Sequence, residues 1–452
     1  MEKIIIPETE IPVVMAVDVV VVGGGPAGFG AAIRSARKGA DTLLIDRFGI
    51  PGGNMTVGLM PCAGFRPMEG VHKEFWERLE KEGNLFDIKA FYPNNPLYHA
   101  YPGYYGMYGF NPDTGGCMMT QMLEEAGVKC LFRTLFVDAT VGKGAGEDTI
   151  EAVIVENVSG REAIKGKIFV DATGRGDLVA KSGAPYMTPG DEKGGIIPPG
   201  LMWRMSGVDI KRLFDYQKNE DDPNLEKAME KAGANGDIPE ALYRPVPPKT
   251  YAAQYKGHPS LNCYPAGEPG ELTIWQDAPN EWNLNCALNA EDATRAEIEL
   301  RKLIIAESGF LKHYVPGFEK AWVSGIAPLM GIREGRHPIG EHLLTYDDIS
   351  HQRTFPDAAL RRSARDRLDF SGKTPRVFEF EVPYRSFLAK KVDNLLLAGE
   401  CVSFEHHALF HGMRAFGPSV QTGEVAGIAA GLSIGQNINP RQLKWTKPLP
   451  RT

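Results

Sequence analysis

The chain lacks the cysteine patterns that mark disulfide-rich proteins and many metal proteins. It has six cysteines among 452 residues, and no two of them form a CxxC pair or another spacing typical of metal ligands. Thiols without such partners are typical of a reducing compartment. We therefore expect free cysteines and predict no metal site. The six are Cys62, Cys117, Cys130, Cys263, Cys286 and Cys401.

A basic surface and a membrane anchor are also missing. The chain has 50 Lys and Arg against 57 Asp and Glu, a formal net charge of -7, so it has no positive excess for binding nucleic acid. Its first apolar stretch, residues 11–22, contains Asp18 and is too short to cross a bilayer. The first residues also lack the features of a signal peptide. We expect a cytoplasmic protein that binds neither nucleic acid nor a membrane.

The most informative segment runs from residue 18 to residue 58. Four valines, residues 19–22, predict a buried strand that leads into a GxGxxG turn. A helix is predicted over residues 27–38, and a second strand over residues 42–45 leads to Asp46. This order of strand, glycine turn, helix, strand and acidic residue is the fingerprint of dinucleotide binding in its required context.

Each glycine of the turn has its own physical task. Gly23 permits the tight turn, Gly25 lets a pyrophosphate approach the backbone, and Gly28 lets the helix pack closely on the strand. The free N–H groups at the start of the helix point at the phosphates. Asp46 can accept hydrogen bonds from ribose hydroxyls. The segment therefore predicts a bound dinucleotide.

The rest of the chain predicts an α/β protein with an insertion. Short strands between residues 135 and 170 indicate a small antiparallel sheet. Residues 190–327 are rich in Pro, Asn and aromatic residues and contain no second glycine turn. We predict a Rossmann-like nucleotide domain, with a parallel sheet plus the small antiparallel sheet, formed by residues 1–189 and 328–452. Residues 190–327 would form an inserted α+β cap or substrate domain.

Four segments together resemble a known family. They read VVVVGGGPAGFGAAIRSARKGADTLLIDRFGIPGGNMTVG, VDATGRGDLVAKSGAP, GIREGRHPIGEHLLTYDDI and NLLLAGECVSFEHHALFHGMRAFGPSVQTGEVAGIAAGL. In this order they resemble the FAD-dependent oxidoreductases of the glutathione-reductase-like superfamily, which are distantly related to fumarate reductase and succinate dehydrogenase flavoproteins. The resemblance implies that the cofactor is FAD.

The resemblance also implies how FAD would lie. The first glycine turn would hold the pyrophosphate and the second, near residue 53, would pass under it, while a late helix would aim its N-terminus at the flavin pyrimidine ring. The implied FAD contacts are Gly23, Gly25, Pro26, Ala27, Gly28, Asp46, Arg47, Gly52, Gly53, Asn54, Thr56, Ala172, Thr173, Gly174, Gly399, Glu400, Gly417, Ser419 and Val420.

Candidate catalytic residues lie in two clusters. The first is His406, His407, His411 and Arg414, where an imidazole could move a proton at neutral pH. Its histidines could instead hydrogen-bond the flavin edges or the backbone. The second spans residues 333–337, where Arg333 and Arg336 could share one face and grip an anionic or polar group. They could instead be a structural pair that ties the cap to the FAD domain.

These clusters favour a hydride transfer between a small organic substrate and flavin N5, with a histidine as proton acceptor. The CH–OH group of a sugar or polyol-like molecule is the favoured donor. Fumarate-reductase-like reduction of an activated C=C bond and an NAD(P)H-driven hydroxylase stay open as alternatives. The electron acceptor is expected to be oxygen, a quinone or a carrier protein, and a homo-oligomer is compatible with the sequence.

Overall fold

The computed structural model describes most of the chain, with gaps at both ends and in several loops. The described residues are 4, 8–65, 69–87, 107–144, 146–190, 196–216, 223–243, 264–265, 270–365, 377–408 and 413–449. In this part of the chain, no helix is both long and apolar enough to cross a membrane.

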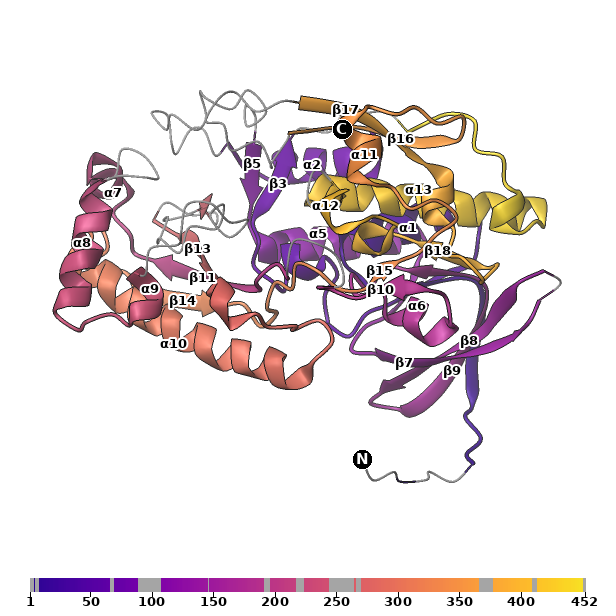
Figure 1. Cartoon of the computed structure of the whole chain (residues 1–452), viewed down its shortest axis with the longest axis horizontal. Coiled ribbons are helices and arrows are strands. Elements are labelled where there is room, and N and C mark those ends of the chain that lie inside the picture. Colours follow the sequence, from indigo (N-terminus) through magenta and orange to yellow (C-terminus); the bar gives the residue numbers. More distant parts are fainter. Residues whose placement is uncertain are drawn as a thin grey trace.

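A seven-stranded sheet forms the centre of the first core (Figure 1). Its strand order is β6-β2-β1-β9-β8-β7, and β18 also pairs with β9. The strands β6, β2, β1, β9 and β18 run parallel, whereas β7, β8 and β9 pair antiparallel. This arrangement confirms the predicted α/β class. The strands are β1 (Val13–Val22), β2 (Thr42–Ile45), β6 (Lys129–Leu131), β7 (Leu135–Lys143), β8 (Asp148–Asn157), β9 (Gly160–Asp171) and β18 (Leu395–Leu397).

The run of valines forms a strand because both faces of this sheet are covered. Val19, Val20 and Val21 are fully buried in β1. Strands that are covered on both faces have continuous apolar sequences instead of the alternation of a half-exposed strand. The valine run therefore fixes β1 in the middle of the parallel strands.

Helices α1 (Pro26–Arg37) and α13 (Phe416–Gln436) pack in backbone contact. A Cβ at Gly423 would lie 1.9 Å from the carbonyl oxygen of Ala27, and a Cβ at Gly427 would lie 2.2 Å from that of Ala31. Because the contact positions increase together along both helices, α1 and α13 run parallel. Both N-termini, with their positive partial charge, therefore lie at the same end of the helix pair.

A small three-stranded sheet and two further helices cover this helix pair. The sheet order is β3-β5-β4, with β3 (Cys62–Phe65), β4 (Leu85–Asp87) and β5 (Met107–Phe110). The helices are α2 (Gly70–Lys81) and α5 (Pro112–Glu125).

The segment between β10 (Tyr186–Met187) and β15 (His337–Pro338) builds most of a second core, seen on the left of Figure 1. An antiparallel sheet of order β12-β13-β11-β14 packs there with helices, around the fully buried Trp203. The strands are β11 (Gly200–Ser206), β12 (Tyr264–Pro265), β13 (Leu272–Asp277) and β14 (Trp322–Ile326). The helices are α7 (Ile210–Tyr216), α8 (Pro223–Ala234), α9 (Glu240–Tyr243) and α10 (Ala290–Tyr314).

The chain then returns from the second core to the first. Strand β15 (His337–Pro338) pairs antiparallel with β10 (Tyr186–Met187), which follows α6 (Asp177–Ser182). Helix α11 (Tyr346–Ser350) and a hairpin lead to β18 and then to the short helix α12 (His406–Ala408). The hairpin consists of β16 (Ala358–Arg365) and β17 (Val377–Pro383).

Candidate functional site

The first glycine turn lies between β1 and α1. Gly23 has a φ of 103°, and a Cβ at Gly28 would lie 1.7 Å from the Gly23 carbonyl oxygen. In contrast, a Cβ at Gly25 would meet no atom within 4 Å. Helix α1 begins at Pro26 without a side-chain cap, so its first N–H groups are available to a ligand. Gly28 therefore serves packing, while Gly25 faces open space.

Asp46, at the end of β2, turns its carboxylate toward this turn. It accepts hydrogen bonds from the Gly24 N–H and, at 2.7 Å, from the Phe48 N–H. Burial raises the pKa of Asp46, although these backbone hydrogen bonds oppose the effect. The neighbouring Arg47 guanidinium lies 4.8 Å from the centre of the Phe48 ring.

A second glycine turn rests on the first. Gly52 has a φ of 106° and donates a hydrogen bond of 2.7 Å to the Gly24 carbonyl. A Cβ at Gly53 would lie 3.2 Å from the Gly25 Cα. This turn continues into a short 3-10 helix, η1 (Gly53–Met55), which contains Asn54. The side chain of Thr56 closes the turn by donating to the Pro51 carbonyl at 2.7 Å.

Two more predicted segments meet the same glycine turn. The N–H of Ala172, after β9, donates to the Val22 carbonyl at 2.9 Å. A Cβ at Gly23 would lie 2.5 Å from the Ala172 carbonyl oxygen. Thr173 and Gly174 follow it. Gly399, after β18, has a φ of 66° and donates to Thr422 of α13 at 2.9 Å. The structure thus brings the predicted segments to one end of the parallel strands.

The N-terminus of α13 lies at this end too. The helix starts at Phe416 without a side-chain cap, and the predicted Gly417, Ser419 and Val420 form its first turns. Gly417 packs against His72 of α2, because a Cβ there would lie 3.1 Å from the His72 Cε1. Two helix N-termini, those of α1 and α13, therefore face the region expected to hold an anionic cofactor.

A buried polar cluster lies between the two cores and consists of Glu334, His337 and His406. His406 Nδ1 lies 2.6 Å from Glu334 Oε1, and His337 Nε2 lies 2.9 Å from the same oxygen. The side chains of all three are 1–3% exposed. Glu334 and His337 come from residues 327–338, the return segment that follows β14 and ends with β15, whereas His406 begins α12. The donor atoms of the three lie within 4.8 Å of one another.

The cluster keeps Glu334 ionised. Burial by itself would raise the pKa of Glu334, but the hydrogen bonds from His337 and His406 outweigh it and hold the pKa at about 2. The other oxygen, Oε2, accepts from the Ile197 N–H at 3.2 Å. Nearby, burial raises the pKa of Glu400 to about 7 against the opposing charge of Arg414.

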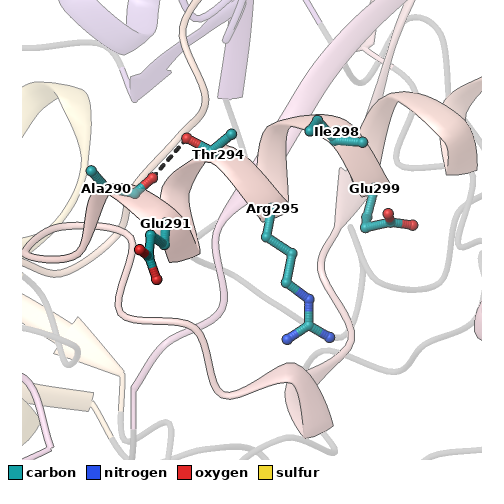
Figure 2. A pocket seen from close by; sticks show the side chains of 6 residues that line it. All are labelled: Ala290, Glu291, Thr294, Arg295, Ile298 and Glu299. Atoms are coloured by element: carbon teal, nitrogen blue, oxygen red, sulfur yellow. Dashed lines mark hydrogen bonds between the residues drawn. The ribbon is translucent and has the colours of Figure 1, made fainter.

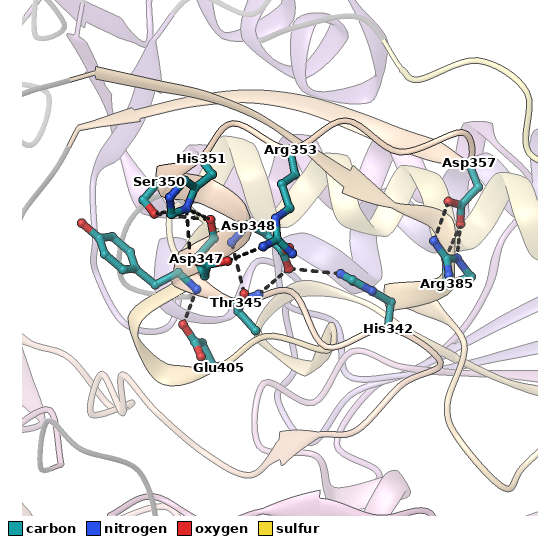
Figure 3. A network of polar contacts seen from close by, with 11 residues as sticks. His342, Thr345, Asp347, Asp348, Ser350, His351, Arg353, Asp357, Arg385 and Glu405 are labelled. Atoms are coloured by element: carbon teal, nitrogen blue, oxygen red, sulfur yellow. Dashed lines mark hydrogen bonds and ion pairs between the residues drawn. The ribbon is translucent and has the colours of Figure 1, made fainter.

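The backbone before His406 is anchored by α11. Glu405 accepts a hydrogen bond from the Tyr346 N–H and donates its own N–H to the Leu344 carbonyl at 3.1 Å. Figure 3 shows this contact beside the capping box of α11, in which Thr345 and Asp348 bond each other's backbone N–H groups. The anchor fixes the position at which the His406 side chain leaves the backbone.

The arginines of the return segment have other partners. Arg336 pairs with Asp177 at 3.1 Å and donates to the Arg175 carbonyl at 3.1 Å, so it ties β15 to the loop before α6. Arg333 pairs with Asp277 and lies 4.3 Å from the centre of a Trp275 ring.

The remaining predicted catalytic residues divide into two groups. Arg414 is half-buried and lies near Glu400. The His407 side chain and the whole of His411 fall outside the described residues.

Two members of the cluster, Glu334 and His337, were not predicted as catalytic residues. The spacing of three residues between them is a signal that they can share one side of a segment. Their meeting with His406 could not be read from the sequence, because it depends on the return of the chain from the second core.

A shallow depression of about 470 Å³ lies on the outer face of α10 (Figure 2). None of the residues of the buried cluster lines it. It is lined by Ala290, Glu291, Thr294, Arg295, Ile298 and Glu299. We therefore do not include it in the candidate site.

Comparison with known proteins identifies the family. Residues 18–449 match the FAD dependent oxidoreductase family, and the chain belongs to it. The protein is thus an FAD-dependent oxidoreductase with FAD as its cofactor, as the sequence motifs predicted.

A protein of Methanosarcina barkeri, described as an uncharacterized protein in the nifH2 5'region, is 30% identical over 189 residues, which are 39% of this chain and 92% of that protein. The mitochondrial dihydrolipoyl dehydrogenase of Schizosaccharomyces pombe is 25% identical over 224 residues, 43% of this chain and 39% of that enzyme.

Solved structures give more distant likenesses. A geranylgeranyl bacteriochlorophyll reductase-like protein from Thermoplasma acidophilum is 13% identical, with a TM-score of 0.42, over 94% of this chain and 80% of that one. A flavin-dependent brominase is 13% identical, with a TM-score of 0.44, over 95% of this chain and 81% of that one. Neither likeness identifies a substrate for this chain.

Proposed function

We propose that FAD binds across the two glycine turns and the N-terminus of α13. The open space at Gly25 and Gly174, where a Cβ would meet nothing within 4 Å, fits a close approach of the cofactor. The uncapped starts of α1 and α13 supply N–H donors and positive partial charge for the pyrophosphate and for an electron-rich flavin edge. The residues that we propose to contact FAD are the nineteen that the resemblance implied.

We propose that the enzyme oxidises a CH–OH group of a small organic substrate, as in a sugar or polyol. FAD supplies the acceptor for the hydride, at N5 of the flavin. His406 takes the hydroxyl proton at Nε2. The observation that supports this role is the 2.6 Å hydrogen bond between His406 Nδ1 and Glu334. A carboxylate behind the ring holds the imidazole in the tautomer whose Nε2 is a base and stabilises the ring once it is protonated.

The alternative reduction of a C=C bond is less well supported. It needs an arginine that can bind a substrate carboxylate, and the two arginines of the return segment bind protein acids: Arg333 binds Asp277 and Arg336 binds Asp177. Arg414 would be left to bind the carboxylate. The carboxylate behind His406 also suits a proton acceptor, because it holds the ring in the tautomer whose Nε2 has no proton.

Anaerobic reduction of the flavin tests the proposal. FAD-loaded enzyme is mixed without oxygen with sugars, polyols and other alcohols, and the loss of visible flavin absorbance is followed. We expect at least one alcohol to bleach the flavin. In His406→Gln the same donor should bleach it more slowly, on the order of 100-fold, which is the contribution of a positioned base.

The exposed His351→Gln is the matched control and should react like the unchanged enzyme. A flavin that no alcohol reduces, but that NAD(P)H reduces, would overturn the proposal in favour of the hydroxylase. Reduction at the same rate in His406→Gln would remove His406 from the role of base.

A further inference from the structure

We infer that Glu334, His337 and His406 form a binding site for a divalent transition metal ion. Each residue offers one donor atom, and these atoms lie within 4.8 Å of one another. Glu334 Oε1 contacts both His337 Nε2 and His406 Nδ1. Two imidazoles and one carboxylate are a donor set that suits zinc, iron, cobalt and nickel. The inference goes beyond the proposed oxidation and does not rest on it.

The present spacing needs only a small expansion to hold a metal. Bonds of about 2.1 Å to nitrogen and oxygen ligands in a tetrahedral arrangement place neighbouring donor atoms about 3.4 Å apart. Glu334 Oε1 is now 2.9 Å from His337 Nε2 and 2.6 Å from His406 Nδ1. Shifts of a few tenths of an ångström at each donor atom would bring the two histidine nitrogens to that separation from Glu334 Oε1.

The groups behind the donor atoms suit a metal site. His337 Nδ1 lies 3.3 Å from the Phe404 carbonyl oxygen. A ring proton on Nδ1 would point at this carbonyl and leave Nε2 free of a proton to bind the ion, as in most metal-bound histidines. The second oxygen of Glu334 accepts from the Ile197 N–H at 3.2 Å, which orients the carboxylate. Each outer contact therefore holds a ligand in a metal-binding orientation.

The position of histidines in the chain agrees with this site. The chain has ten histidines, and His337, His406, His407 and His411 lie in two short segments. The structure brings His337 and His406 of these segments together on one carboxylate.

A bound metal ion and the proposed role of His406 as a base exclude each other. An ion on His406 Nδ1 requires the ring proton to move to Nε2, and a protonated Nε2 cannot accept the proton of an alcohol. Binding of a metal ion therefore stops alcohol oxidation reversibly. This consequence gives a second readout, but metal binding itself is measured without any substrate.

Equilibrium dialysis of the FAD-loaded protein against zinc chloride tests the site, after prior treatment with a chelator. Elemental analysis should find one zinc ion per chain. In Glu334→Gln, His337→Gln and His406→Gln we expect zinc affinity to fall on the order of 100-fold. His342→Gln is the matched control, because His342 also contacts a carboxylate, Asp348 at 3.2 Å, but lies outside the cluster; its zinc affinity should not change.

X-ray absorption at the zinc edge of the unchanged protein provides a readout that needs no variant to fold. We expect nitrogen and oxygen ligands at about 2.0–2.2 Å and no sulfur. The inference would be overturned by sulfur ligands or by the absence of bound zinc. It would also be overturned if the three variants, with normal FAD content, bound zinc as tightly as the unchanged protein. If zinc binds but no alcohol reduces the flavin, the proposed oxidation alone is rejected. If an alcohol reduces the flavin but zinc does not bind, the metal site alone is rejected.

Discussion

Glu334 and His406 lie 72 residues apart in the sequence, and His406 Nδ1 donates a hydrogen bond of 2.6 Å to Glu334 Oε1. The bond joins the return segment to the segment after β18, at the junction of the two cores. Both side chains are almost fully buried, so solvent does not screen their interaction as it screens an exposed ion pair. The two residues should therefore act as one unit.

The first prediction concerns Glu334→Gln. The amide keeps the shape of the side chain but removes the charge that orients and supports the His406 ring. We expect reduction of the flavin by its alcohol substrate to slow on the order of 100-fold, with normal FAD content. Rapid-mixing absorbance measures the rate. Glu341→Gln, which changes a partly exposed partner of Arg441, is the control and should leave the rate unchanged. Equal rates in Glu334→Gln and the unchanged enzyme would contradict the paired role.

The second prediction separates two glycines of one motif. In Gly25→Ala the new methyl group meets no protein atom, so the unfolding free energy should change by less than about 1 kcal/mol. The same methyl group would occupy the space expected for the pyrophosphate, so the FAD dissociation constant should rise at least about tenfold, or about 1.4 kcal/mol. Fluorescence titration of the apoprotein with FAD measures this constant.

Gly28→Ala should instead lower the stability of the protein, because its methyl group would lie 1.7 Å from the Gly23 carbonyl oxygen. We expect a loss of about 3 kcal/mol in unfolding free energy. Gly309→Ala is a control, because Gly309 lies within α10, toward its C-terminal end, and a Cβ there would meet nothing within 4 Å. It should stabilise the protein by about 1 kcal/mol and leave FAD affinity unchanged. Unchanged FAD affinity in Gly25→Ala would show that the cofactor does not pass over this turn.

Much of the fold could be predicted because its signals are local. The valine run of β1, the GxGxxG spacing and the acid after β2 each act within a few residues, so the sequence contains the whole pattern. The return segment is different. Its motif contains Arg333, Glu334 and Arg336, and charge alone favoured the arginines as the residues that bind an anionic group.

The structure explains the different roles of these neighbours. Pairing of β15 with β10 places Arg336 beside Asp177, and the second core supplies Asp277 to Arg333. Glu334, between them, faces a histidine that comes from another segment. Such contacts depend on where separate parts of the chain meet, and no spacing within one segment records that.

The third prediction concerns Glu424, which joins three helices. Its carboxylate on α13 accepts from Arg34 Nε of α1 at 2.7 Å and from the Val71 N–H of α2 at 2.8 Å. Glu424→Ala leaves a buried N–H and an arginine without this acceptor, so we expect a loss of about 3 kcal/mol in urea unfolding. Glu74→Ala removes a more exposed partner of Arg37 and should cost less than about 1 kcal/mol. Equal losses in the two variants would contradict a special role for Glu424.

The fourth prediction is a pH dependence of stability that arises in the second core. Glu307 of α10 is 2% exposed, and its Oε2 makes no hydrogen bond to any described residue. Burial raises the pKa of Glu307 from an ordinary value of 4.5 to about 8. At pH values between 4.5 and about 8, Glu307 keeps its proton in the folded protein but has released it in the unfolded chain.

Stability must therefore fall as the pH rises through this window, with a slope that approaches about 1.4 kcal/mol per pH unit from this one group. Below pH 4.5 the contribution is fully present, and above about pH 8 it is lost. Glu307→Gln imitates the protonated acid, so its advantage in unfolding free energy over the unchanged protein should grow from pH 5 to pH 8 and then stay constant. Urea unfolding at a series of pH values measures the difference. Glu299→Gln, on the exposed side of the same helix with Lys302 as its partner, should show no such growth. A pH-independent difference for Glu307→Gln would mean that Glu307 titrates normally and that water reaches it inside the second core.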